Sequence, residues 1–112
     1  MFVNQIPEFP QFGRQGLPAA KSEQVNAMSD LYPQPGDPDQ GWGLTFMLTP
    51  EASATGRGRN TASWAGIANL FWWCDREKGV AGMIAAQIMP FGDMNVLGTM
   101  AECEKAVYNA LG

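Results

Sequence analysis

One stretch of the chain, residues 61–89, limits what the rest can fold into. It is rich in tryptophan, isoleucine, phenylalanine and small apolar residues, which favour the pleated, buried surface of a sheet. The sequence predicts two long strands, 62–74 and 80–89, joined by a charged turn over 75–79 that ends in a glycine able to adopt positive φ. A helix over 81–89 is the alternative, because alanine and methionine are good helix formers.

Both faces of this predicted hairpin are apolar. Leu70 and Trp72 fall on one face, whereas Phe71 and Trp73 fall on the other. The second strand is apolar on both sides as well, with residues Val80, Ile84 and Ile88 opposed to Met83, Ala85 and Met89. A sheet of this kind needs a covering layer on each side.

Residues 1–41 differ in character from the rest of the chain. Seven of the eight prolines lie within the first 50 residues, and each removes an N–H and restricts the residue before it. The apolar residues of this part are Phe2, Ile6, Phe9, Phe12 and Leu17. We therefore expect an irregular arm laid over a larger body, with a short helical turn around 22–28 capped by Ser22.

The remaining elements are a strand and a helix. Residues 42–48 alternate bulky and small side chains, as a strand does, and a polar loop, 51–60, follows. Asp93 is placed to cap a C-terminal helix, 93–111, and an apolar stripe along it comprises Val96, Met100, Cys103, Val107 and Leu111. The predicted fold class is α+β: three antiparallel strands within 42–89, one C-terminal helix, and one face of the sheet without cover.

Composition excludes several classes of function. The 112 residues carry a net charge of −4, and the seven basic residues are scattered, so we expect no nucleic-acid partner. No apolar run is long enough for a membrane span, and the first residues lack the features of a secretory signal; we expect a cytoplasmic protein. Cys74 and Cys103 are expected to be buried free thiols, and the sequence predicts no metal site and no cofactor.

The chain contains no histidine, which excludes Ser-His-Asp and Cys-His sites made from these residues alone. It contains no S-x-x-K motif either, so no catalytic residue is predicted. Ser29–Asp30 has the form of part of an S-D-N element but no partner motif, and Asp37 with Asp39 is interpreted as a solvated pair. The Gly-Arg-Gly-Arg run at 56–59 is interpreted as flexible surface, with anion binding as the alternative.

Small residues interrupt the bulky strand within Trp64, Ala65, Gly66 and Ile67, at Ala65 and Gly66. A glycine inside a strand marks a bulge or a place where another group approaches the backbone. If this part of the strand is an edge, its free N–H groups can bind a substrate carbonyl or an oxyanion. Close packing against a helix explains the small residues equally well.

The order of three segments resembles a known family. These segments are GWGLTFML at 41–48, GRGRNTASWAGIANLFWWCDREKGVAGMIAAQIMPFGD at 56–93, and the amphipathic C-terminal helix. They look like the C-terminal end of the class C β-lactamase-like serine hydrolases, in the fungal esterase branch that includes lovastatin-type acyltransferases. The likeness covers nearly the whole chain and is most specific over 69–79.

The resemblance implies a partial β-lactamase/transpeptidase-like fold and a site between the sheet and a helical region. In that family the nucleophilic Ser and its Lys belong to S-x-x-K, a Tyr base follows, and all three precede the region matched here. The final motif, W-G-G in the esterase branch, corresponds to Trp64, Ala65 and Gly66, with Ala65 in place of the first Gly. By resemblance, the N–H of Ile67 is the second oxyanion donor, and the substrate of the longer parent is an acyl ester or acyl thioester.

Two functions are compatible with the sequence. The first is the C-terminal portion of a serine esterase or acyltransferase, inactive alone because nucleophile and base are absent; a truncated gene model, a degenerate copy and a natural short product all fit it. The second is a non-enzymatic interaction module that completes its sheet with a partner chain. In either case the uncovered sheet face is expected to favour self-association.

Overall fold

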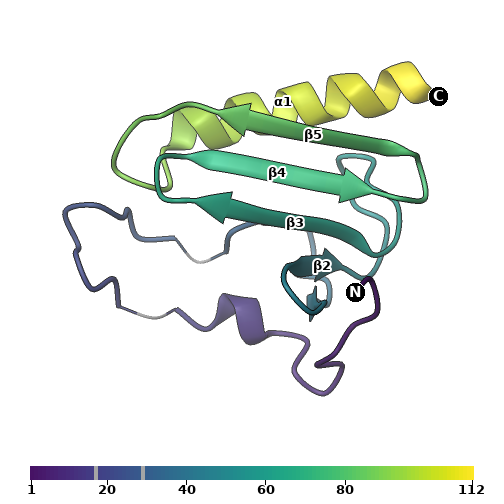
Figure 1. Ribbon diagram of the computed structural model, residues 1–112, viewed down its shortest axis with the longest axis horizontal. Helices are drawn as coiled ribbons and strands as arrows, with labels where there is room; N and C mark the ends of the chain where they lie inside the picture. The colour runs from purple at the N-terminus through teal and green to yellow at the C-terminus, as the bar shows by residue number, and fades with distance from the viewer. Residues whose placement is uncertain (17, 29) are drawn as a thin grey trace.

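The computed structural model describes residues 1–16, 18–28 and 30–112, so the predictions made for Leu17 and Ser29 lie outside the described residues. The fold is α+β, with a five-stranded antiparallel sheet in chain order and a C-terminal helix (Figure 1). The strands are β1 (Gly41–Trp42), β2 (Met47–Thr49), β3 (Thr61–Gly66), β4 (Leu70–Asp75) and β5 (Val80–Ala85). The α-helix is α1 (Met94–Leu111), and a short 3-10 helix, η1, spans Phe12–Arg14.

The prediction of three strands is wrong, because two of the predicted strands are each divided by a turn into a pair of strands. Residues 62–74 form β3 and β4, which pair from Ala62 with Cys74 to Gly66 with Leu70. The three residues between the strands make the turn, and Asn69 takes a φ of 56° there. A three-residue hairpin loop needs its last residue in this left-handed region, which asparagine tolerates better than most residues.

The strand predicted over 42–48 is also a hairpin. Gly41 pairs with Leu48 and Trp42 with Met47, and the Gly43 N–H donates to the Phe46 carbonyl at 2.9 Å. A Cβ at Gly43 would collide with the Met1 carbonyl oxygen, so only a glycine leaves room for the first residue of the arm. Strand alternation alone could not reveal this turn.

The charged turn over 75–79 is confirmed, with Gly79 at a φ of 67°. The helical alternative for 81–89 is wrong, since β5 pairs with β4 from Val80 to Ala85. The strand is shorter than the predicted 80–89, because Gln87 takes a φ of 58° and turns the chain away.

The helix is confirmed, and the Asp93 carboxylate caps it by accepting from the N–H groups of Asn95 and Val96. Its buried side chains are Val96, Met100, Glu104 and Tyr108. The predicted stripe is therefore wrong in part: Cys103 and Leu111 are exposed. Glu104 takes the inward position because a buried arginine meets it there, as described below.

The helix covers only one face of the sheet. Phe71 and Trp73 are 2% and 4% exposed and pack with the buried side of α1. On the opposite face Phe2 and Phe46 reach Trp72 and the half-buried Cys74, but Met83 on β5 is 67% exposed. Figure 1 shows no drawn segment in front of β4 and β5. The described residues thus leave part of this face uncovered, and no helix among them could cross a membrane.

The N-terminal arm is irregular, as predicted, but it is held at defined points. Residues 22–24 form a turn, so the helical turn predicted around 22–28 is wrong, and Val25 lies beside Phe91 in an isolated parallel bridge. The Asn26 N–H donates to the Phe91 carbonyl and the Phe91 N–H donates to the Gln24 carbonyl, both at 2.8 Å. These bonds fix the arm beside the segment between β5 and α1.

Candidate functional site

The second half of β3 is an edge of the sheet. β2 pairs with Thr61, Ala62 and Ser63 and goes no further. From Trp64 to Gly66 the strand pairs with β4 alone among the described residues. An unpaired strand edge presents backbone N–H and C=O groups that another molecule can bind.

The hydrogen-bond pattern decides which backbone groups face this open side. The bond from Ala86 N–H to the Asn69 carbonyl sets the alternation between β4 and β5, so that Leu70 and Trp72 turn their backbone groups toward β3. Gly66, which is paired with Leu70, then faces β4, and Ala65 faces the open side. The Ile67 N–H shares a planar trans peptide with the Gly66 carbonyl and points the opposite way. The N–H groups of Ala65 and Ile67 are therefore directed to the open edge.

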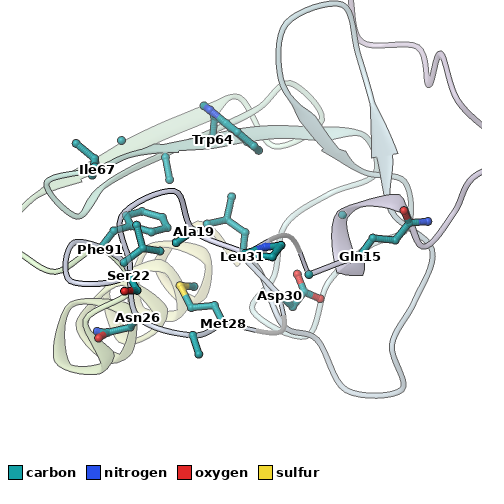
Figure 2. Close-up of a pocket in the computed structure, with 17 residues that line it drawn as sticks. Gln15, Ala19, Ser22, Asn26, Met28, Asp30, Leu31, Trp64, Ile67 and Phe91 are labelled. Atoms are coloured by element: carbon teal, nitrogen blue, oxygen red, sulfur yellow. The ribbon is translucent and has the colours of Figure 1, made fainter.

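A cavity of about 900 Å³ lies along this edge. Figure 2 shows Trp64 and Ile67 on one side of it, and Asn26, Met28 and Asp30 of the arm on the other. The four residues Trp64, Ala65, Gly66 and Ile67 all line it. The apolar residues that complete its walls are Pro18, Ala19, Val25, Ala27, Leu31 and Phe91. A neutral, largely apolar group fits such walls better than an ion.

Asp30 is the acidic residue in the cavity wall, but its hydrogen-bonding capacity is already used. One carboxylate oxygen accepts from Arg14 Nε at 2.9 Å, and the other accepts from Gln40 Nε2 at 2.9 Å and from the Tyr32 N–H at 3.0 Å. Asp30 thus holds together three parts of the arm, at Arg14, Tyr32 and Gln40.

A polar cluster that sequence reasoning missed lies deeper in the molecule. The side chains of Arg57 and Glu104 are 0% exposed and make a two-pronged ion pair, with N–O distances of 2.6 and 3.0 Å. Tyr32 and Thr55 also donate to Glu104 Oε1, the oxygen that accepts from Arg57 Nε, at 3.0 and 2.7 Å. Burial raises the pKa of the Tyr32 phenol, although the nearby Arg57 charge opposes that rise. A predicted amphipathic stripe gives no signal for such a buried glutamate.

The Arg57 guanidinium also lies 3.7 Å from the centre of the Tyr32 ring. Because Arg57 is buried and paired, the anion-binding alternative for the Gly-Arg-Gly-Arg loop is wrong at this residue. Arg59 is also paired: its guanidinium Nη2 lies 2.5 Å from a carboxylate oxygen of Glu51 in an exposed ion pair. The predicted Asp37–Asp39 pair is solvated, since both residues are exposed. No group of three potential metal-ligating side chains occurs in the described ranges.

Comparison with known proteins gives a partial match. Over 33 residues the chain is 48% identical to an acyltransferase, calJ, of Penicillium decumbens. The matched stretch covers 30% of this chain and 8% of that protein, so the chain is similar to a small part of a much longer relative. No protein-family model matches the chain. No solved structure matches it significantly.

Proposed function

We propose that this chain is the C-terminal portion of a serine esterase or acyltransferase with a β-lactamase-like fold. In this proposal the open edge of β3 binds the acyl carbonyl, and the nucleophile and base come from sequence outside these residues. The observation that carries it is the position of Trp64, Ala65, Gly66 and Ile67 along a cavity of about 900 Å³. The partial similarity to a fungal acyltransferase supports the same reaction class.

The chemistry required of the edge is simple. In acyl transfer the carbonyl oxygen gains negative charge in the tetrahedral intermediate, and N–H donors that are already in place stabilise it. The Ile67 N–H would be one donor, and the nucleophile's own N–H the other. The apolar walls would hold the acyl group, or the alcohol part of a neutral ester or the thiol part of a thioester. Ala65 has a methyl group where the W-G-G motif has a glycine hydrogen. This methyl group changes the space beside the bound carbonyl and leaves the direction of the Ile67 N–H unchanged.

The test compares this chain with a longer product of the same gene. The chain alone should not hydrolyse 4-nitrophenyl esters above the buffer rate, and a fluorophosphonate probe should label none of its serines. A longer product that carries S-x-x-K in the same reading frame should do both. Labelling of any serine in the chain alone would contradict the proposal, as would an inactive longer product that folds.

The uncovered sheet face favours a second candidate, a non-enzymatic interaction module. Met83 is 67% exposed on a face whose counterpart is buried under α1, and large apolar patches on soluble proteins commonly mark interfaces. This function predicts a stable stoichiometric complex that needs Met83 and not Ile67. The acyl-transfer function predicts the reverse dependence for ester turnover.

A further inference from the structure

Asn69 has a buried side chain whose every hydrogen bond goes to backbone. The residue is 0% exposed. Its Nδ2 donates to the carbonyls of Ile88 at 3.0 Å and Pro90 at 2.8 Å. Its Oδ1 accepts from the N–H groups of Gly92 at 2.9 Å and Asp93 at 3.0 Å. The amide thus uses both donors and both acceptor lone pairs, from a residue that holds a φ of 56°.

These four bonds join two segments that each contribute a residue to the cavity wall. Asn69 ends the turn that begins with Ile67, and both Ile67 and Phe91 line the cavity. The segment that receives the bonds carries Phe91, which is itself bonded to the arm at Gln24 and Asn26. The Asn69 amide is therefore a link between the turn that follows β3 and the segment that carries Phe91.

We propose that Asn69 is a positioning residue of the candidate site. It sets the separation of the Ile67 N–H from Phe91 and the arm, and it does not touch the ligand. This inference rests on the proposed function, because it assumes that the cavity binds an acyl compound. Asparagine suits this role better than its closest relatives, because aspartate would lose both donors and add a buried charge, and a longer glutamine would need a different turn.

The test uses the complete chain with Asn69→Gly. Glycine tolerates positive φ, so the variant removes the four bonds without straining the turn. The probe is butyryl 4-nitroanilide, a neutral amide that a chain without a nucleophile leaves intact. We expect the Kd of this probe to rise about tenfold, an effect similar to the loss of roughly one hydrogen bond from the complex. A second readout needs no ligand: hydrogen exchange of the Ile88 N–H, which donates to the Ala68 carbonyl at 3.2 Å, should become faster.

The matched control is Tyr108→Phe. It removes the buried bond from the Tyr108 hydroxyl to Asp75, 2.8 Å long, at a residue that does not line the cavity. It should lower the free energy of unfolding while leaving both the Kd and the relative protection of Ile88 unchanged. Equal losses of affinity in the two variants would reduce Asn69 to a stabilising residue, and an unchanged Kd and Ile88 exchange in Asn69→Gly would overturn the inference.

The experiments distinguish failure of the proposed function from failure of the role proposed for Asn69. If the unsubstituted chain does not bind the anilide, the proposed function is contradicted at this cavity. The structural part of the inference, that Asn69 fixes the Ile67 turn against the Phe91 segment, is then decided by the amide signals alone. Loss of Ile88 protection together with a shifted Ile67 signal in Asn69→Gly supports it, and unchanged signals overturn it.

Discussion

At the scale of single residues, the buried pair of Arg57 and Glu104 shows what a linear pattern cannot reveal. Each residue is separately typical of solvent-exposed positions, and they lie 47 positions apart. Removing either partner leaves a charge in the interior without compensation, which costs far more than losing an exposed pair. The pair also holds Tyr32, and through Tyr32 the C-terminal end of the arm.

Glu104→Gln should therefore be strongly destabilising. We expect the free energy of unfolding to fall by about 3–5 kcal/mol, the usual effect of breaking a buried ion pair, as measured by urea denaturation. The matched control is Arg59→Gln, whose exposed pair with Glu51 should contribute about 0–1 kcal/mol. Similar small losses in both variants would mean that Glu104 is not buried against Arg57 in solution.

Asp75 gives the molecule a defined response to acid. Burial pushes the pKa of its carboxyl upward, but hydrogen bonds from Gly58, Lys78, Tyr108 and Glu77 outweigh it, so the pKa lies below its ordinary value of 3.8. A lowered pKa in the folded state stabilises the fold at every pH above 3.8, and this stability is lost as the pH falls through the folded pKa.

Asp75→Asn should consequently cost about 1–3 kcal/mol near neutral pH, as expected for hydrogen bonds to a charged group. The difference between the two proteins should shrink below pH 3.8, where the unfolded carboxyl is protonated. Denaturation midpoints measured from pH 2 to pH 7 would check this. A difference that stays constant with pH would show that the Asp75 charge adds nothing.

At the scale of elements, the sequence predicted which stretches form strands and helices better than it predicted where each strand begins and ends. The aromatic density of 61–89 predicted a sheet, and Asp93 predicted the start of α1. The turn at 67–69 was missed because both faces of that stretch are apolar, so a break in the strand leaves no change in hydrophobic period. The turn at 43–46 was missed because the alternation of bulky and small side chains runs through it without a break. The candidate residues at 64–67 were found from the small Ala65 and Gly66 inside a bulky strand and from the family resemblance, whereas the cavity beside them depends on how the arm folds back.

Packing between β5 and β4 gives a prediction at this scale. A Cβ at Gly82 would run into the Trp73 indole, whereas one at Gly98 on α1 has nothing within 4 Å. Gly82→Ala should lower the free energy of unfolding by about 1–3 kcal/mol through overpacking. Gly98→Ala should raise it by about 0.5–1 kcal/mol, because alanine has the higher helix propensity. The measurement is thermal melting. If the melting temperatures of both variants changed in the same direction, the close packing of Gly82 against Trp73 would be contradicted.

At the scale of the whole molecule, the uneven cover of the sheet is the dominant feature. One face is buried under α1, and the described residues cover the other in part, where Phe2 and Phe46 pack. A sheet that is apolar on both faces and covered on one is expected to associate with something. In the proposed function that neighbour is the rest of a longer enzyme.

The isolated chain should therefore self-associate or bind a hydrophobic dye. Met83→Lys places a charge on the open face, where the side chain is 67% exposed, and should reduce both effects without loss of the fold. Sedimentation velocity and dye fluorescence measure the change. A wild-type chain that sediments as a monomer, melts sharply and binds no dye would contradict this prediction.

The most direct test of the central claim, that the open edge of β3 is the acyl-binding surface, is an NMR titration of the ¹⁵N-labelled chain. The ligand is butyryl 4-nitroanilide, whose carbonyl should accept from the N–H groups directed to the open side. We predict downfield shifts of the Ile67 and Ala65 amide protons that saturate together, with smaller changes at Phe91 in the cavity wall. Shifts confined to the Met83 face, or no saturable shift at Ile67, would contradict the account.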